Sequence, residues 1–315
     1  MTTSDSERLR RELLLRSVFT QMPPAAHVRL VDRLEEMNVD AGETILEYGE
    51  APSHILFLAE GKVKMEAPAE PPWVLTAVAV VGVVDAVLER PRKRNCTTLE
   101  PSRLLRLQAS DWFDLMEDNA QVARAVIKNI ATQLHRRWQK VATRLPQSEP
   151  PRGITPAMPD SFDKVLALRN SAFVKRAGMQ AQVSLASVAE PVMLGAGETL
   201  FAEGAASGDI YVVASGLIEF AQGDLKVRYR SGELVGGPAA LGQMLSGYSA
   251  RAIVPSVALR IAEQDFYDRA EEHERLTRSA LAYLVSELEP MLALESQNEK
   301  EATESGAPLA VDPTA

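Results

Sequence analysis

One sequence pattern occurs twice in this chain, as AGETILEYGEAPSHILFLAEGKVKM at residues 41–65 and as AGETLFAEGAASGDIYVVASGLIEF at residues 196–220. The two stretches align without a gap, with Ala196 standing 155 residues after Ala41. A repeat this long indicates a duplicated domain, because solenoid proteins repeat every few tens of residues. The length of 315 residues is also typical of two domains. We therefore expect two copies of one fold.

Each copy is expected to consist of a helical part, a β-rich body and a second helical part. The β-rich bodies contain short apolar runs separated by Gly and Pro, which favour an antiparallel barrel or jelly roll. The expected fold class is mainly β with flanking helices, as two β-jelly-roll barrels, each with N- and C-terminal helices. The predicted ranges are helices at 5–17 and 25–37, strands within 39–107 and a helix at 111–144, followed by a helical part at 161–190, strands within 192–261 and a helix at 264–294.

Composition divides the chain further. Residues 145–160 hold five prolines in LPQSEPPRGITPAMPD and are typical of a linker. The predicted domains are therefore 1–144 and 161–295, joined by the Pro-rich linker 145–160. Residues 296–315 are polar, and we expect them to form a disordered tail.

Charge and residue counts exclude several classes of function. The net charge of −9 argues against broad affinity for DNA, which needs a surplus of Lys and Arg. No apolar run is long enough to span a bilayer, and a charged N-terminus is unlike a signal peptide. The single cysteine, Cys96, fits a reducing cytoplasm. Neither a metal site nor an enzyme is expected, because the four histidines lack metal-ligand spacing and no Walker, G-x-S-x-G or dinucleotide motif is present. The Ala- and Arg-rich composition favours a bacterial source.

The repeated stretch also carries a family resemblance. Its order and spacing resemble the cyclic-nucleotide-binding domain of the cAMP receptor protein and of the regulatory subunit of protein kinase A, present here as two copies. The residues that carry the resemblance are Gly42, Glu43, Ile45, Gly49, Ile55 and Gly61 in the first copy, and Gly197, Glu198, Leu200, Gly204, Ile210 and Gly216 in the second. These residues build the fold, since the glycines suit tight turns, and they specify no ligand.

The resemblance places a ligand site in the phosphate-binding cassette of the first copy, with cAMP or cGMP as the implied ligand. In this family backbone N–H groups and an Arg meet the cyclic phosphate, while a Glu takes the ribose hydroxyl. Here Val83 stands where the Glu is usual, and Asp85 stands where a small Ala is usual. The candidate pocket residues are Gly82, Val83, Val84, Asp85, Arg92 and Lys93.

Two readings of the first cassette stay open. Asp85 is predicted either to act as a built-in counter-ion in place of the phosphate, facing Arg92, or to face solvent. The run RPRKR at 90–94 is either part of a ligand pocket or a solvated basic loop.

The second cassette departs further from the family pattern. Gly236 and Ala239 are kept, but Gly237 replaces the usual Glu, and Pro238 removes one backbone donor. Ser246 stands at the position of the Arg. We expect no cyclic nucleotide to bind there.

The expected function is that of a non-catalytic regulatory or adaptor protein that senses cAMP or cGMP through its first domain. The alternative is a ligand-independent scaffold or assembly protein. An unidentified protein is the expected partner, with no DNA because no helix-turn-helix follows Leu294, and with no membrane insertion. An apolar stripe from Val122 to Trp138 packs either on its own domain or in a homo-oligomer.

Overall fold

The computed structural model describes residues 24–68, 70–141 and 157–305 of the chain. The predicted helix at 5–17 and most of the predicted linker lie outside these residues. The described chain divides into two compact units. The first unit ends at Val122 and also includes the chain from Ser286 onward, and the second runs from Ala123 to Val285. The boundaries of the predicted domains stay a prediction.

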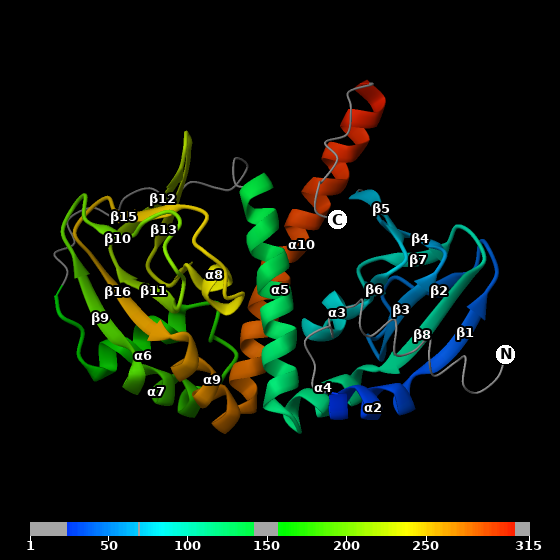
Figure 1. The fold of residues 1–315 in the computed structure, drawn as a ribbon, viewed down its shortest axis with the longest axis horizontal. Coiled ribbons are helices and arrows are strands. Elements are labelled where there is room, and N and C mark those ends of the chain that lie inside the picture. Colours follow the sequence, from blue (N-terminus) through cyan, green and yellow to red (C-terminus); the bar gives the residue numbers. More distant parts are fainter. Residues whose placement is uncertain (1–23, 69, 142–156, 306–315) are drawn as a thin grey trace. The chain divides into compact units, whose positions relative to one another are not determined.

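The first unit contains two four-stranded sheets, with strand orders β1-β8-β3-β6 and β2-β7-β4-β5 (Figure 1). All strand pairs in these sheets are antiparallel. Its elements are α2 (Pro24–Arg33), β1 (Glu35–Val39), β2 (Thr44–Leu46), β3 (His54–Glu60), β4 (Lys62–Ala67), β5 (Glu70–Thr76), β6 (Ala79–Val81), α3 (Val83–Val87), β7 (Asn95–Thr98), β8 (Ser102–Gln108) and α4 (Ala109–Glu117).

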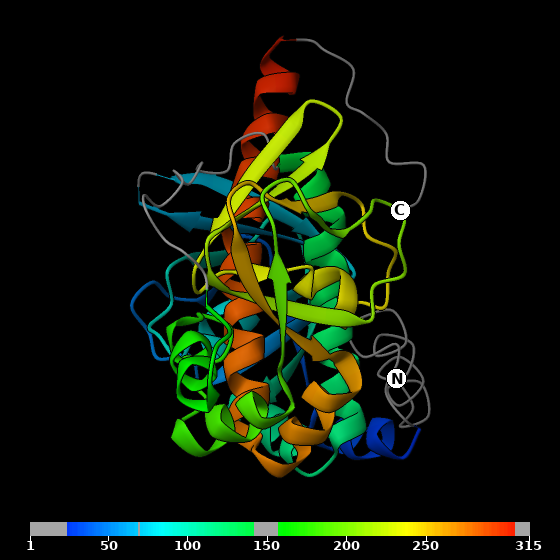
Figure 2. The same ribbon diagram turned by 90° about the vertical axis from the view of Figure 1, so that its left-hand side faces the viewer.

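The second unit repeats this topology, with strand orders β9-β16-β11-β14 and β10-β15-β12-β13. Its strands face the viewer in Figure 2. Its elements are α6 (Ser161–Asn170), α7 (Met179–Val188), β9 (Glu190–Leu194), β10 (Thr199–Phe201), β11 (Asp209–Ser215), β12 (Leu217–Gln222), β13 (Leu225–Arg230), β14 (Leu234–Val235), α8 (Gly237–Leu241), β15 (Ser249–Ala252), β16 (Ser256–Ala262) and α9 (Glu263–Glu272). The unit boundaries fall within α5 (Ala120–Val141) and α10 (Glu274–Ser305).

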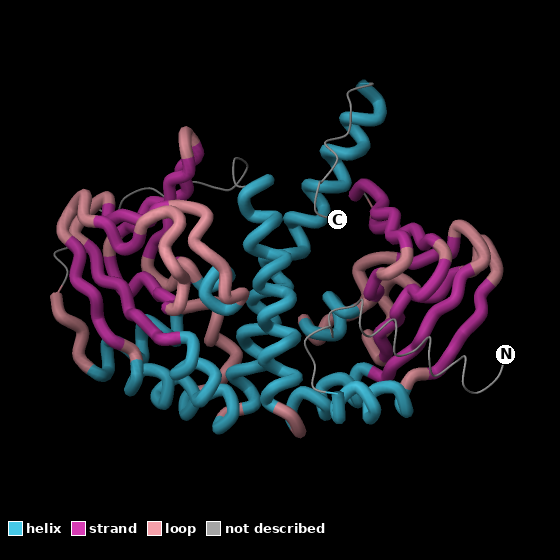
Figure 3. The backbone as a smooth tube through the Cα atoms, in the orientation of Figure 1, coloured by secondary structure: helices cyan, strands magenta, loops and turns pink. Residues whose placement is uncertain are grey.

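The predicted fold class, mainly β with flanking helices in two copies, is confirmed (Figure 3). One glycine turn explains part of the repeat. Gly61 has φ of +102°, and a Cβ there would lie 2.2 Å from Ser102 Oγ; Gly216 has φ of +89° and the same 2.2 Å approach to Ser256 Oγ. Both copies therefore need glycine at this position.

Several predicted helix limits are wrong. The helix at 25–37 ends at Arg33, and Met37 lies in β1. The helix at 111–144 is two helices, because the Asn119 side chain accepts hydrogen bonds from the N–H groups of Gln121 and Val122 and so caps a new start. The predicted helical parts at 161–190 and 264–294 are each divided in two as well. At the C-terminus α10 continues to Ser305, so residues 296–305 of the expected disordered tail are helical.

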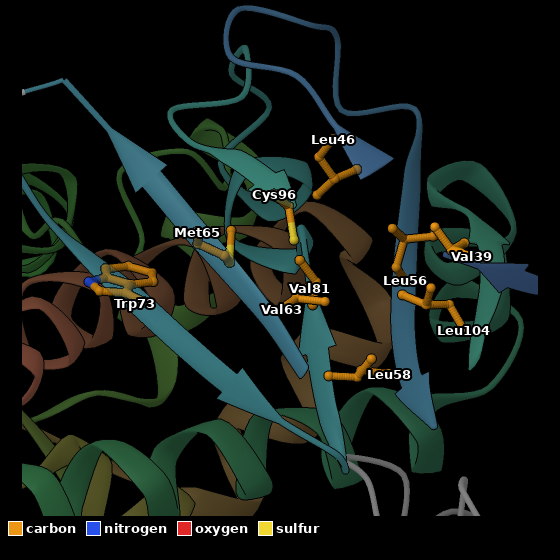
Figure 4. Close-up of a cluster of buried hydrophobic side chains, with 10 residues drawn as sticks. All are labelled: Val39, Leu46, Leu56, Leu58, Val63, Met65, Trp73, Val81, Cys96 and Leu104. Carbon is orange, nitrogen blue, oxygen red and sulfur yellow. The ribbon is translucent and has the colours of Figure 1, made fainter. Parts of the chain in front are cut away.

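A buried apolar cluster fills the space between the sheets of the first unit (Figure 4). Leu292 and Ala293 of α10 pack against this cluster and are partly buried. At these two residues α10 therefore packs on the first β-body. The buried members of the cluster are Val39, Leu46, Leu56, Leu58, Val63, Met65, Trp73, Val81, Cys96 and Leu104.

Candidate functional site

The first cassette begins at Gly82, which precedes the short helix α3. Gly82 has φ of +82°, and a Cβ there would lie 2.5 Å from Nη1 of Arg92. A side chain is excluded both by the backbone conformation and by this close approach. The sequence therefore places glycine where the cassette backbone meets the Arg92 guanidinium.

Arg92 is buried, with 1% of its surface exposed. Its Nη1 donates to the Gly82 carbonyl oxygen at 2.6 Å, and its Nη2 donates to the carbonyl oxygen of His54 at the start of β3. Burial lowers the pKa of Arg92, while the nearby carboxylates of Asp85 and Glu50 oppose that shift. The guanidinium therefore ties the cassette to β3 through two backbone carbonyls.

Asp85 is also buried, so the reading in which it faces solvent is wrong. Its Oδ1 accepts a hydrogen bond from Nε of Arg90 at 2.8 Å, and its Oδ2 accepts one from the Lys93 backbone N–H at 3.4 Å. Asp85 thus forms its ion pair with Arg90, two residues before the predicted Arg92. Asp85 still acts on Arg92 through space, since its charge favours the protonated guanidinium.

Arg90 has a second carboxylate partner. Its Nη2 donates to Oε1 of Glu289 in α10 at 2.5 Å. Burial alone would lower the pKa of Arg90, but its hydrogen bonds with Glu289 and Asp85 outweigh that effect and raise the pKa. Two ion pairs that share Arg90 therefore connect three charged groups, Asp85 of α3, Arg90 of the following loop and Glu289 of α10.

Arg94 completes an alternating set of arginines at positions 90, 92 and 94. It is buried, its guanidinium carbon lies 3.8 Å from the centre of the Trp73 ring, and it pairs with Glu70. Burial lowers its pKa. Because Arg92 and Arg94 are buried, the reading of this run as a solvated basic loop is wrong.

The remaining predicted pocket residues are more exposed. Val83 and Val84 in α3 are half-buried, and Lys93 is exposed. The structure thus brings Gly82, Asp85 and Arg92 into one cluster, whereas Lys93 contributes its backbone N–H to it. Sequence reasoning missed Arg90, Arg94, Glu70, Trp73 and Glu289, although Arg90 and Arg94 belong to the basic run RPRKR that it singled out.

The second cassette keeps the backbone of the first. Ser246 takes the place of Arg92, because its carbonyl oxygen accepts from the Gly204 N–H at 2.8 Å, as the Arg92 carbonyl oxygen does from the Gly49 N–H at 2.8 Å. The Ser246 hydroxyl donates to the Tyr248 carbonyl oxygen at 2.6 Å. The side chain at this position is therefore short and already hydrogen-bonded.

Aromatic rings occupy the interior beside the second cassette. The Tyr248 ring is stacked on Phe220, with ring centres 4.2 Å apart, and lies 6.1 Å from the ring of Phe201. Tyr248 is buried, and burial raises the pKa of its hydroxyl. A Cβ on Gly236 would lie 3.3 Å from the Phe201 ring, so the rings approach the cassette backbone closely.

The helix α5, from Ala123 onward, belongs to the second unit. Arg124 pairs with Glu263 at 3.2 Å, and Lys128 donates to the Gln243 side chain at 2.6 Å. Val126, Ile130 and Leu134 of its apolar stripe are buried within the chain, and Trp138 lies where no side chain is described. A homo-oligomer through this stripe stays a prediction.

The described residues lack two kinds of feature. They contain no group of three or more His, Cys, Asp or Glu side chains arranged to hold a metal ion. Among their helices, none has both the length and the apolar content to cross a membrane.

Comparison with known proteins assigns both β-bodies to one family. The family model described as "Cyclic nucleotide-binding domain" matches residues 36–119 and 191–273, more than half of the chain. A search of curated proteins gives no match.

Solved structures that resemble the chain include three regulatory proteins. The regulatory domain of Toxoplasma gondii PKA, crystallised with cAMP, is 12% identical, with coverage of 96% of this chain and 99% of that chain and a TM-score of 0.36. The cAMP-bound PfPKA-R is 15% identical, with coverage of 98% and 94% and a TM-score of 0.39. The regulatory subunit of a cAMP-independent protein kinase A from Trypanosoma brucei is 13% identical, with coverage of 86% and 89% and a TM-score of 0.35.

Proposed function

The chain belongs to the cyclic nucleotide-binding domain family, and we propose that it is a regulatory protein whose two domains act through protein contacts without binding a cyclic nucleotide. The observation that carries this proposal is the position of Arg92. Its guanidinium donates to the carbonyl oxygens of Gly82 and His54 and is almost fully buried. A phosphate would have to break both hydrogen bonds to reach it.

Electrostatics add to this cost in the first domain. Asp85 is buried at the same cassette, and its carboxylate would repel an incoming cyclic phosphate. Val83 offers no acceptor for a ribose hydroxyl, which the family resemblance assigns to a Glu at this position. All three arginines already have partners in the chain itself, because Arg92 donates to backbone carbonyl oxygens and Arg90 and Arg94 pair with carboxylates.

The second domain supports the same proposal by different chemistry. Ser246 supplies no positive charge at the position equivalent to Arg92. The rings of Tyr248 and Phe220 occupy the interior next to it. An anionic ligand would therefore meet buried apolar surface and no cation at this position.

The alternative is cAMP or cGMP sensing through the first domain, with the pocket formed by Gly82, Val83, Val84, Asp85, Arg92 and Lys93. It is favoured by the presence of Gly82 and Arg92 in one cluster. Binding of a nucleotide there would break the two hydrogen bonds of Arg92, and each costs about 1.5–3 kcal/mol for a charged donor.

Calorimetric titration of the full chain with cAMP and with cGMP distinguishes the two functions. The proposal predicts no binding heat for the wild-type protein at high nucleotide concentration. Micromolar binding that Arg92→Ala abolishes would overturn it and establish the sensor.

A rebuilt cassette provides the matched gain-of-function test. The double variant Val83→Glu/Asp85→Ala restores the family's acceptor and its small residue while leaving Arg92 in place. If these two positions close the pocket, the double variant binds a nucleotide and the wild-type protein does not. Addition of Arg92→Ala to the double variant should then remove the binding again.

A further inference from the structure

Arg90 uses two different nitrogens of its guanidinium for two carboxylates. Nε faces Asp85 at 2.8 Å, and Nη2 faces Glu289 at 2.5 Å. The side chains of Arg90 and Glu289 are 22% and 24% exposed, so this pair is largely shielded from water. Asp85 holds Nε and so orients the guanidinium, and Nη2 is then directed at Glu289 of α10.

The contact with α10 has an apolar part beside the ionic one. Leu292 and Ala293 stand three and four residues after Glu289, so the three side chains share one face of the helix. Leu292 and Ala293 pack on the buried cluster of the first unit. One helix face therefore supplies both the carboxylate and the apolar contact.

The positive charges of Arg90 and Arg94 favour an acidic group at the position of Glu289. Arg94 lies close enough that the charges of Glu70, Glu289 and Asp85 all favour its protonated form. Removal of Glu289 would leave Nη2 of Arg90 without this carboxylate, while Nε keeps Asp85. A half-buried guanidinium nitrogen that loses a charged acceptor is destabilised, so the site favours occupation by a carboxylate.

We propose that Arg90 forms a carboxylate-binding site on the first domain and that Glu289 is its internal ligand, which holds residues 286–293 of α10 against the cassette helix α3. The ligand class is a helix that presents a Glu followed by apolar side chains three and four residues later. In this chain the occupant is α10 itself. This site is separate from nucleotide binding, because Arg90 does not occupy the position that the family resemblance assigns to the phosphate.

Hydrogen–deuterium exchange of the full-length protein tests the site. In Glu289→Gln we expect exchange of the amides in residues 286–293 and 83–88 to become about tenfold faster, as loss of one charged hydrogen bond implies. Glu274→Gln is the matched control, because Glu274 is exposed on the same helix. Its exchange in these two segments should match that of the wild-type protein. Equal exchange in Glu289→Gln and Glu274→Gln would overturn the proposal.

Chemical rescue with acetate tests the ligand class. Glu289→Ala removes the carboxylate and leaves space beside Arg90, so sodium acetate should slow exchange in residues 83–88 relative to sodium chloride at equal ionic strength. The double variant Arg90→Gln/Glu289→Ala should show no such rescue. Absence of rescue in Glu289→Ala, or equal rescue in the double variant, would contradict a carboxylate site at Arg90.

These readouts are independent of the proposed function. The exchange pattern can hold whether or not the wild-type protein binds cAMP, and the nucleotide titration can fail while the Arg90 site stands. Should Glu289→Ala fail to fold, Glu289→Gln decides, because it keeps the size of the side chain and removes only its charge.

Discussion

Gly82→Ala tests whether the first cassette depends on the close approach of Arg92. Gly82 has φ of +82°, a conformation that costs a residue with a Cβ about 1 kcal/mol or more. An added Cβ would also lie 2.5 Å from Nη1 and 3.1 Å from Cζ of Arg92. The guanidinium must therefore move, although Nη1 holds a hydrogen bond of 2.6 Å to the Gly82 carbonyl oxygen.

The expected magnitude follows from these two effects. The backbone conformation contributes about 1 kcal/mol, and loss of a buried charged hydrogen bond contributes about 1.5–3 kcal/mol. We expect Gly82→Ala to lower the free energy of unfolding by about 2.5–4 kcal/mol. Gly49→Ala is the matched control, because Gly49 has φ of +84° and no described heavy atom within 4 Å of an added Cβ. It should cost about 1 kcal/mol.

Urea unfolding monitored by tryptophan fluorescence measures both values, since Trp73 and Trp112 are buried in the first unit. The double variant Gly82→Ala/Arg92→Ala removes the group that the new Cβ meets. Its destabilisation should therefore be smaller than the sum of the two single effects. If Gly82→Ala costs no more than Gly49→Ala, the inference that Arg92 is held against the cassette backbone is refuted.

Further predictions concern the second domain. Tyr248→Ala should lower the unfolding free energy by about 3–5 kcal/mol because it removes a buried ring stacked on Phe220, whereas Tyr248→Phe keeps the ring and should cost far less; equal losses in urea unfolding would contradict this. Burial holds the pKa of His135 below its ordinary value of 6.5, so the unfolded state binds more protons and stability should fall as the pH drops below about 6.5; His135→Gln should flatten that slope. Burial opposes ionisation of Glu219, but hydrogen bonds from Arg251 and Arg228 outweigh it and lower the pKa of Glu219 below 4.5. The difference in unfolding free energy between the wild-type protein and Glu219→Gln should therefore shrink as the pH falls below that value.

The duplicated fold could be predicted because its signal is local and occurs twice. Glycine turns such as Gly61 and Gly216 have the same φ sign and the same close approach to a serine in both copies. The helix limits were harder to predict, because apolar periodicity continues across the breaks that split the predicted helices. The break before α5 depends on the Asn119 cap, a single side chain within a periodic pattern.

The cassette could be located from the sequence, but its contacts could not. Counting along the family pattern singled out Asp85 and Arg92, and both lie in the cluster that the structure forms. The partner of Arg90 stands 199 residues away, at Glu289, and no local pattern indicates that pairing. The choice of Arg90 over Arg92 as the partner of Asp85 depends on side-chain directions that spacing does not specify.

The two cassettes share backbone features although their side chains differ. Each begins at a glycine with positive φ, and each places a non-glycine residue at positive φ after the short helix, Glu89 at +51° and Gln243 at +54°. The side chains around these matching backbones share little chemistry, since the first has Arg92 and carboxylates and the second has Ser246 and aromatic rings. The same cassette backbone is therefore compatible with two unrelated sets of side chains. Side-chain substitutions can change what each domain binds without changing its fold, which is why the ligand of each domain has to be argued from its own side chains.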